Sequence, residues 1–335
     1  MEILRSVVSP TSLADFVSKS YAIGSIVSHK LLKACGSNDI YLLQTKNQAY
    51  VAKLFSKRLC WQFTKPHFLY ELEMQYFLKN QDVPVSAPLF NLRQELVTEF
   101  PAPEYKKYLC MYPFISCNQE KKTRYQKYFL LGQTLAKFHK EGKKFKPNST
   151  IKRVLDINFL VQAPLKRLHK YANIYSGELY KELDIVAEAL QNALDAIMYS
   201  DFSESIIHGD VHCGNFVFSN NKAILIDFEL SGYGKTIYDL ATLYWDTILF
   251  KKPQVAKSIW SHFLKGYLTI GLLPQDEMKS IRLIAQVRHF FMMGSSYILY
   301  PELAKFNTEV RIKKDLCYID KLKKSAIDQR TFCIE

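Results

Sequence analysis

The pattern of apolar residues changes near residue 115, and this change limits the folds open to the chain. Before it, short runs rich in Ile, Val, Leu and Tyr alternate with turn-forming residues, as β-strands do. After it, apolar residues recur at helical spacing over long stretches, and one β-type region remains around residues 206–227. The sequence therefore predicts an α+β fold, with a small strand-rich lobe and a larger helical lobe that carries one small hairpin.

The expected elements follow from this pattern. A helix at residues 63–79 should end before the prolines at 84 and 88, which cannot continue it. The strand-rich part, residues 1–110, would be followed by a connector at 111–117 and a helical lobe at 118–335. Ligand sites prefer the cleft between two such lobes. The strands are expected at 25–34, 40–45, 48–55, 96–100 and 108–114, and the later helices at 121–139, 176–199, 254–270, 276–299 and 309–325.

Composition excludes several classes of protein. With 48% hydrophobic residues, the chain of 335 residues can bury a core, which excludes a disordered protein. Its first residues show no secretory signal. The most apolar late segment, residues 284–300, is interrupted by Arg288 and His289 and is too short to span a membrane. Seven scattered cysteines without a Cys-x-x-Cys pair indicate reduced thiols, so we expect a cytoplasmic protein.

Positive charge is concentrated in residues 101–170. This segment holds 16 Lys and Arg against 4 Asp and Glu, and so carries 12 of the 13 net positive charges. It indicates an anionic partner or substrate, or else a solvated helix face. No base-stacking aromatic motif accompanies the charge, so no nucleic-acid partner is expected. A basic nucleic-acid-binding or scaffold protein is the remote alternative.

The segment from His208 to Asn215 (His-Gly-Asp-Val-His-Cys-Gly-Asn) is followed by an apolar run that ends in Asp227. An acid, an amide five residues later and a second acid at the end of a strand are typical of kinase-type phosphoryl transfer. There the first Asp receives the acceptor hydroxyl, and the Asn and the second Asp hold magnesium. Mg²⁺ prefers near-octahedral oxygen coordination, which two hard oxygen ligands on adjacent hairpin arms can provide.

The first lobe offers the complementary residues. Lys53 lies on the third expected strand, where a lysine can pair with phosphates. Glu71 follows 18 residues later on the next helix, placed to pair with Lys53, and Glu73 is a competing partner. The turn Gly36-Ser37-Asn38 lies between the first two strands, where a backbone cradle over the phosphates is expected.

These motifs resemble those of the aminoglycoside phosphotransferase and choline kinase family, whose members have a protein-kinase-like fold of two lobes. The resemblance rests on residues 208–215, on Ile226-Asp227-Phe228-Glu229 and on Tyr238-Asp239-Leu240-Ala241, with weaker support from residues 83–88 and 131–139. It covers roughly residues 20–300. Within the family, the sequence looks most similar to the bacterial stress response kinase and type II homoserine kinase branches.

The resemblance implies a role for each matching residue. Asp210 would be the catalytic base, and Asn215 and Asp227 would bind magnesium. Lys53 would contact the phosphates of ATP. The connector Met111-Tyr112-Pro113-Phe114 would hydrogen-bond the adenine through its backbone. Two Mg²⁺ ions are expected with ATP, and Glu229 is a candidate for reaching the second one through water.

Other residues near the motif are expected to support it. Asp239 should brace the catalytic loop rather than touch the substrate. His208 and His212 could bind metal or transfer protons, but bracing of the loop is the preferred interpretation, and His139 should pack in the core. Gly209 replaces the arginine that usually precedes the catalytic Asp in protein kinases. Only 11 residues lie between Asp227 and Asp239, too few for a long activation segment.

Two kinase hypotheses follow. The first is an ATP- and magnesium-dependent enzyme that phosphorylates a hydroxyl on a small-molecule acceptor. The basic segment argues weakly against a polycationic antibiotic, and homoserine, a sugar, a choline-like alcohol and a metabolite with an acid group stay open. The second is a Ser/Thr protein kinase of the stress response kinase type, with a protein substrate. The two differ in where label from ATP would be found, in metabolites or in protein.

Overall fold

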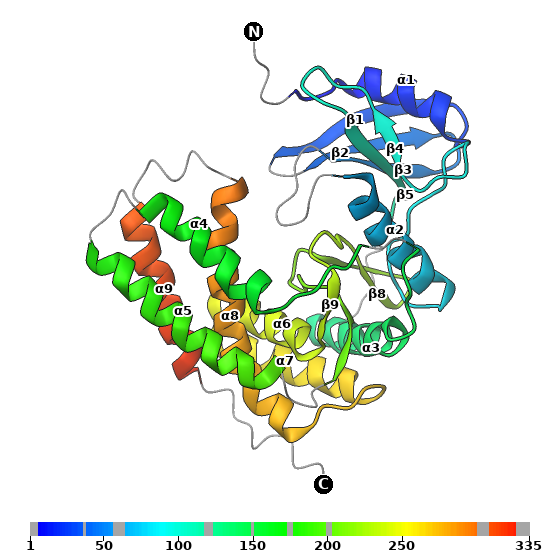
Figure 1. Cartoon of the computed structure of the whole chain (residues 1–335). Coiled ribbons are helices and arrows are strands. Elements are labelled where there is room, and N and C mark those ends of the chain that lie inside the picture. Colours follow the sequence, from blue (N-terminus) through cyan, green and yellow to red (C-terminus); the bar gives the residue numbers. More distant parts are fainter. Residues whose placement is uncertain are drawn as a thin grey trace. The chain divides into compact units, whose positions relative to one another are not determined.

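The computed structural model describes residues 6–35, 38–55, 64–116, 123–148, 151–172, 177–198, 203–299 and 308–325. The chain divides into two compact units (Figure 1). The first unit comprises Met1–Glu120, Lys144–Lys152 and Val217–Leu230, and the second comprises Lys121–Lys143, Arg153–Phe216 and Ser231–Glu335. A five-stranded antiparallel sheet and a mainly helical region confirm the predicted α+β class. The boundaries predicted for the lobes and the connector stay predictions.

The sheet of the first unit has the strand order β1-β2-β3-β5-β4, and all neighbouring strands are antiparallel. All five expected strands are present. The first two strands extend further toward each other in sequence than expected, since Cys35 at the end of one pairs with Asn38 at the start of the next. The bounds are β1 Ile26–Cys35, β2 Asn38–Thr45, β3 Ala49–Phe55, β4 Thr98–Phe100 and β5 Lys107–Pro113.

Two helices cover opposite faces of this sheet. Helix α1 (Pro10–Ser20) packs Leu13 and Val17 into a core with Leu109, whereas α2 (Lys65–Asn80) packs Phe68 into a second core with Cys110. Successive residues of β5 therefore point to the two cores in turn, as the pleat of a strand requires. Helix α1 was not predicted. Its signal is Ser9-Pro10, since the Ser9 side chain accepts the amide N–H of Ser12 at the helix start.

A buried ion pair ties the segment before α1 to the sheet. The Glu104 carboxylate accepts bonds from the Ser6 amide (2.9 Å) and hydroxyl (2.8 Å), and pairs with Lys107 Nζ (3.0 Å). The Glu104 side chain is 2% exposed. Burial alone would raise the pKa of Glu104, but the bonds from Ser6 and Lys107 lower it to about 2. The ionised form is therefore strongly preferred in the folded protein.

We expect Glu104→Gln to lower the free energy of unfolding at pH 7 by about 2 kcal/mol, the size of a buried charged hydrogen bond. Because the folded pKa is depressed, this contribution is fully present above pH 4.5 and is lost as the pH falls toward 2. Melting of both proteins from pH 7 to pH 3 measures it, with Glu99→Gln as the exposed control. A difference that stays constant over this range would contradict the assignment.

The second unit is mainly helical. All four helices expected after residue 170 are present, and α3 corresponds to the helix expected at 121–139. A π-helical turn (η1, Asn158–Gln162) and two α-helices were not predicted. Helix α6 has no solvent-exposed face between Ile237 and Thr247, because every residue in this stretch is buried. The helices are α3 Arg124–Gly142, α4 Ala163–Ala172, α5 Gly177–Met198, α6 Ile237–Phe250, α7 Pro253–Leu268, α8 Gln275–Leu299 and α9 Thr308–Lys324.

The small hairpin predicted after residue 200 is present, but this region also contains a second pair of strands that was not predicted. Strand β6 (Glu204–Ile207) pairs with β9 (Gly232–Lys235), and β7 (Phe216–Ser219) pairs with β8 (Lys222–Leu225). The β7–β8 hairpin turns at Asn220-Asn221, both with positive φ, as a tight hairpin requires. From Val217 onward, this hairpin belongs to the first unit, where Leu225 exchanges backbone hydrogen bonds with Pro84 and Ser86.

Helices α3 and α7 touch through their backbones. A Cβ atom on Gly132 would lie 2.0 Å from the carbonyl oxygen of Phe263, and one on Gly266 would lie 1.9 Å from that of Phe129. No side chain fits at either position, so the two glycines set the distance between the helices.

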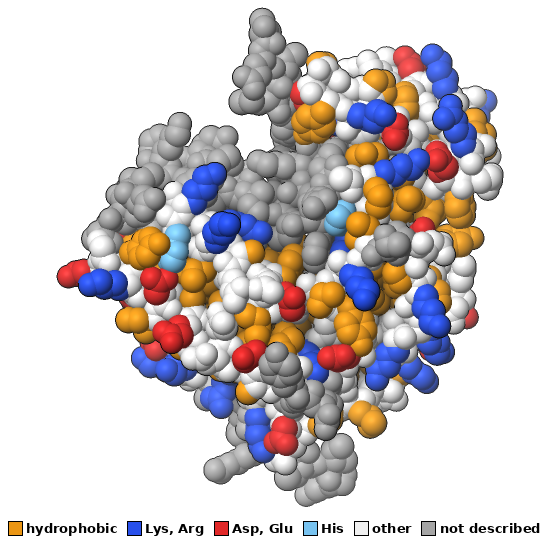
Figure 2. All heavy atoms as spheres, viewed as in Figure 1, with side chains coloured by type: hydrophobic (Ala, Val, Ile, Leu, Met, Phe, Trp, Pro, Cys, Tyr) orange, Lys and Arg blue, Asp and Glu red, His pale blue; other side chains and the backbone are white. Residues whose placement is uncertain are grey.

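The described residues of the basic segment have more than one environment. They are divided between the two units, and Lys107 and Arg153 are buried within them. On the face drawn in Figure 2, Lys and Arg side chains lie among acidic and apolar ones. Within the described residues, no helix is long and apolar enough to cross a membrane.

Candidate active site

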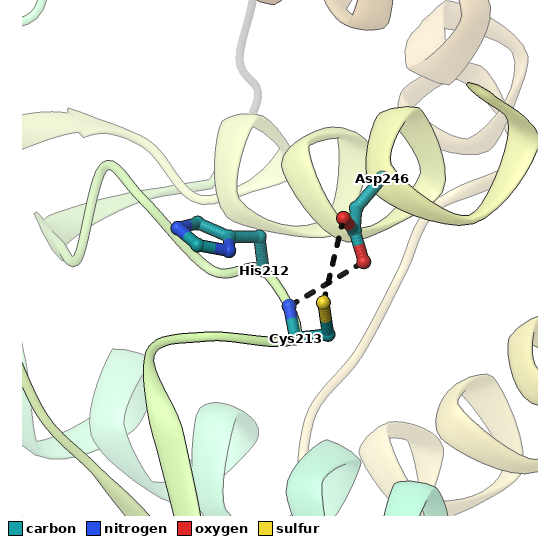
Figure 3. Close-up of side chains that lie close together, drawn as sticks. All are labelled: His212, Cys213 and Asp246. Atoms are coloured by element: carbon teal, nitrogen blue, oxygen red, sulfur yellow. Dashed lines mark hydrogen bonds between the residues drawn. The ribbon is translucent and has the colours of Figure 1, made fainter. Parts of the chain in front are cut away.

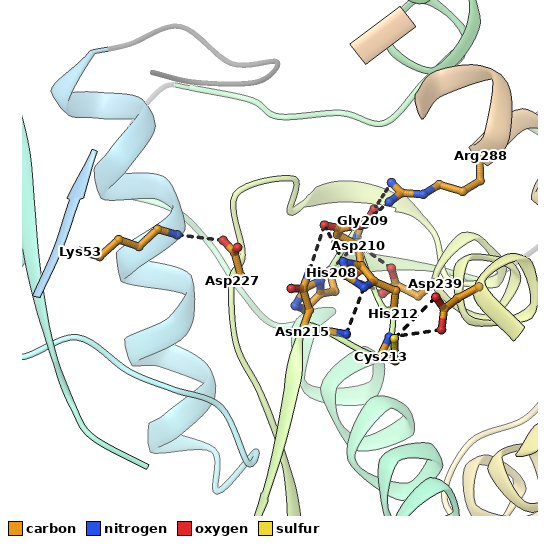
Figure 4. A network of polar contacts seen from close by, with 12 residues as sticks. Lys53, His208, Gly209, Asp210, His212, Cys213, Asn215, Asp227, Asp239 and Arg288 are labelled. Carbon is orange, nitrogen blue, oxygen red and sulfur yellow. Dashed lines mark hydrogen bonds and ion pairs between the residues drawn. The ribbon is translucent and has the colours of Figure 1, made fainter. Parts of the chain in front are cut away.

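The loop from His208 to Asn215 begins where the buried strand β6 ends, and it is held by Asp239 of α6 (Figure 4). The Asp239 carboxylate is fully buried and accepts the amide N–H groups of His208 and Gly209, both at 2.7 Å. Its Oδ2 also contacts His139 Nε2 at 3.0 Å, and His139 Nδ1 contacts the Tyr267 hydroxyl at 2.9 Å. The predicted bracing role of Asp239 and the burial of His139 are confirmed.

The side chain of Asp210 is held by three neighbours. Arg288 of α8 forms an ion pair with Oδ1 and also donates to the Gly209 carbonyl at 3.1 Å. Asn215 Nδ2 donates to Oδ2 at 2.9 Å and to the backbone carbonyl of Asp210 at 3.0 Å. His212 Nε2 lies 3.6 Å from Oδ2. Because the Asn215 nitrogen is used in this way, its Oδ1 is the atom suited to a metal ion.

Burial alone would raise the pKa of Asp210. The charge of Arg288 and the contact with His212 outweigh burial and hold this pKa well below its usual range. Asp210 is therefore ionised at neutral pH, while 21% of its side chain stays exposed. It can accept a hydrogen bond from a ligand.

Both loop histidines are fixed by the backbone. His208 Nδ1 accepts the Asp210 amide N–H at 3.2 Å, and His212 Nδ1 accepts that of Gly214 at 3.1 Å. An imidazole nitrogen that accepts carries no proton, so Nε2 holds the proton in the neutral ring. This places an N–H of His212 toward Asp210, and it agrees with bracing of the loop.

Cys213 connects the loop to α6 (Figure 3). Asp246 accepts from the Cys213 amide at 3.4 Å and from its thiol at 3.8 Å. Ligand atoms of His212, Cys213 and Asp246 all lie within 4.8 Å of one another, a spacing compatible with a metal ion. Burial and Asp246 raise the pKa of the Cys213 thiol, which favours the protonated donor. In this structure the hydrogen bonds from Cys213 to Asp246 anchor the loop on α6.

The second group of predicted residues lies in the first unit. Lys53 on β3 pairs with Asp227, just after β8, at 2.8 Å. Burial alone would lower the pKa of Lys53, but the charges of Asp227, Glu71 and Glu229 raise it well above its usual value. Glu71 is buried, whereas Glu73 accepts the amide N–H of Asn148. The charges of three carboxylates thus act on this one lysine.

Asp227 has a left-handed backbone conformation, with φ of 61°. Such a conformation is uncommon outside glycine, although Asp tolerates it better than most residues, and it is often found at functional sites. It directs the residue away from the path of β8.

The remaining predicted nucleotide contacts differ in how far the structure supports them. Gly36 and Ser37 lie outside the described residues. Asn38 begins β2, and its side-chain nitrogen Nδ2 donates to the Glu229 carboxylate at 3.2 Å.

In the predicted connector, Met111 and Tyr112 belong to β5, and Phe114 follows the strand. The Met111 carbonyl already accepts the amide of Leu89, and the Phe114 amide donates to Ala49. Because backbone groups alternate between the edges of a strand, the Pro113 carbonyl faces the same edge as that of Met111.

Comparison with known proteins agrees with these motifs. Residues 30–268 match the model of the phosphotransferase enzyme family. The chain belongs to this family. The resemblance inferred from the sequence is therefore confirmed, together with the protein-kinase-like fold that the family members share.

Of two similar proteins, one is uncharacterised and the other is named as a homoserine kinase. An uncharacterised protein of Synechocystis is 28% identical over 84% of this chain and 76% of its own length. A homoserine kinase of Chelativorans is 24% identical over 83% of this chain and 82% of its own.

Two solved structures of the family show the same fold. One is an amicoumacin kinase in complex with AMP-PNP, Ca²⁺ and Ami, with a TM-score of 0.74, 17% identity and 96% of both chains covered. The other is choline kinase from Cryptosporidium parvum, with a TM-score of 0.62 and 15% identity, covering 93% of this chain and 96% of that one.

Arg288 is the main residue of the site that sequence reasoning missed. It lies 78 positions from Asp210, so no local spacing connects the two. The sequence did contain one indication of this role. Arg288 lies within the apolar segment 284–300, and a charged residue that is buried with such a segment needs a partner.

Proposed function

We propose that the protein transfers the γ-phosphoryl group of ATP to a hydroxyl of a small-molecule acceptor. The observation that carries this proposal is the Asp210 carboxylate, which is ionised, partly exposed and held in place by Arg288, Asn215 and His212. Membership of the phosphotransferase enzyme family and the Lys53–Asp227 pair support it.

The residues present suit magnesium and a nucleotide. The Asn215 amide oxygen and the Asp227 carboxylate are hard oxygen ligands of the kind that Mg²⁺ prefers. We propose that Asn215 and Asp227 hold Mg²⁺, that Glu229 assists through water, and that the Pro113 carbonyl contacts the adenine. When bound, Mg²⁺ would neutralise negative charge that develops on the phosphates.

The reaction then needs few groups. Lys53 neutralises the phosphates and orients them. Asp210 accepts the hydrogen bond of the acceptor hydroxyl and receives its proton as the new O–P bond forms. The bond from the γ-phosphorus to the bridging oxygen breaks, ADP leaves with the electron pair, and the proton passes from Asp210 to solvent. The low pKa of Asp210 favours proton transfer late in this sequence.

Melting with Mg-ATP tests the nucleotide assignment. At one hundred times its Kd, a ligand adds about 2.7 kcal/mol to the free energy of unfolding, so the melting temperature should rise by several degrees. Asp227→Ala should abolish this shift, and Asp276→Ala, an exposed aspartate on α8, should retain it. No shift in the wild-type protein at saturating Mg-ATP would contradict the proposal.

The acceptor can be identified by incubating the protein with Mg-ATP and a pool of metabolites, followed by phosphorus NMR. A new phosphate ester that depends on Asp210 would support a small-molecule acceptor. Label from ATP that enters protein bands instead, and disappears with Asp210→Ala, would support the protein kinase alternative.

A further inference from the structure

Arg288 is buried between two aromatic side chains. Its side chain is 1% exposed, and its guanidinium carbon lies 5.2 Å from the ring centroid of Trp245 and 5.7 Å from that of Phe291. Aromatic faces attract a guanidinium and restrict its movement. From this position it contacts both the Gly209 carbonyl and Asp210. The planar group of Arg, with several donors in a fixed arrangement, is suited to such a double contact.

These contacts divide the two oxygens of Asp210 unequally. Oδ2 accepts from Asn215 and faces His212, whereas Oδ1 is bound by Arg288. Each carboxylate oxygen can accept about two hydrogen bonds. Oδ1 therefore keeps room for one more donor, while Oδ2 accepts from Asn215 and has His212 Nε2 3.6 Å away.

We propose that Arg288 is a positioning residue, which fixes the Asp210 carboxylate so that Oδ1 receives the acceptor hydroxyl. This inference rests on the proposed function. Arg288 is too deeply buried to touch the acceptor, so it acts through Asp210. In this loop Gly209 takes the place of the arginine that usually precedes the catalytic Asp of protein kinases. Arg288 brings a guanidinium next to the loop from α8 instead.

A purely structural role explains less of the geometry. Apolar side chains of similar volume often replace a buried ion pair without loss of stability, so an arginine is not needed to join α8 to the loop. What arginine adds is direction, because its two terminal nitrogens bind two successive residues of the loop. A carboxylate that is misplaced by about 1 Å can lower a rate about 100-fold.

The test uses phosphate release from Mg-ATP, with water in place of the unidentified acceptor. Arg288→Ala should lower kcat about 100-fold, the cost of a misplaced reacting group. The KM for ATP should stay within about threefold, because Arg288 does not bind the substrate. Ethylguanidinium added to Arg288→Ala should raise the rate with increasing concentration, whereas tetramethylammonium at equal ionic strength should not. Arg282→Ala, an exposed arginine on the same helix, is the matched control.

Arg288→Lys provides a second test if the alanine variant is unstable. Lysine keeps the charge but not the double contact, so its rate should lie between those of the wild type and the alanine variant. A folded Arg288→Ala or Arg288→Lys variant with wild-type kcat would overturn the inference while leaving the proposed function intact. A raised KM for ATP with unchanged kcat would also overturn it. Absence of phosphate release and of an Mg-ATP melting shift in the wild type would overturn both.

Discussion

Replacing Asp210 with asparagine is expected to lower kcat by about 1,000-fold, within the range for loss of a general base. Asparagine keeps the size of the side chain but can neither carry the charge nor receive the proton of the acceptor. The melting shift with Mg-ATP should remain, because Lys53 and Asp227 are unchanged. Phosphate release and the melting shift, measured on one preparation, separate the loss of chemistry from the loss of nucleotide binding.

The same substitution has a second consequence, since it leaves the charge of Arg288 buried without a counterion. Removing one partner of a buried pair costs about 3 kcal/mol, so the melting temperature of Asp210→Asn should fall. Adding Arg288→Met should recover much of this stability but none of the activity. Recovery of activity in the double variant would show that Asp210 is not the base. An unchanged kcat in Asp210→Asn would show the same.

Asp239→Ala is expected to cause the largest loss of stability. It removes the acceptor for two buried backbone N–H groups and for His139, and the sum of such losses is about 4 kcal/mol. The melting temperature should fall by about 6 °C, from the usual entropy of unfolding per residue and the length of 335 residues. The rate of phosphate release should fall as well at temperatures where the variant is folded, because Gly209 and Asp210 lose their support.

Asp276→Ala is a suitable control for this variant, because Asp276 is exposed and pairs only with the nearby Lys279 among the described contacts. Its melting temperature should stay within about 1 °C of the wild type. If Asp239→Ala melted like this control, the bracing of the catalytic loop would have to come from elsewhere.

The sequence predicted those parts of the site that are local in the chain. The interval from Asp210 to Asn215 is short and belongs to one loop, so its spacing reflects its geometry. Lys53 was identified because a lysine within an apolar strand is uncommon. Asp227 follows a clear β-type run, whereas Asp239 was identified from its motif, Tyr238-Asp239-Leu240-Ala241, and not from the pattern of its helix.

The features that were missed depend on contacts between distant segments. Arg288 reaches Asp210 from α8, and β9 pairs with β6 across the loop and the β7–β8 hairpin. Helix α6 is buried from Ile237 to Thr247, and it lacks the alternation of exposed charged residues and buried apolar ones that marks a surface helix. The cradle expected at Gly36 and Ser37 stays a prediction.

The backbone contact between α3 and α7 reaches further than the packing of two helices. Helix α3 carries His139 and α7 carries Tyr267, which contact each other, and His139 in turn contacts Asp239 beneath the catalytic loop. Every link in this series is a backbone contact or a hydrogen bond between buried side chains. A methyl group at Gly132 would push α3 and α7 apart, and this displacement would reach the catalytic loop through the same contacts. In genetic terms, Gly132 and Gly266 are positions where a temperature-sensitive allele can arise without any change in a catalytic residue.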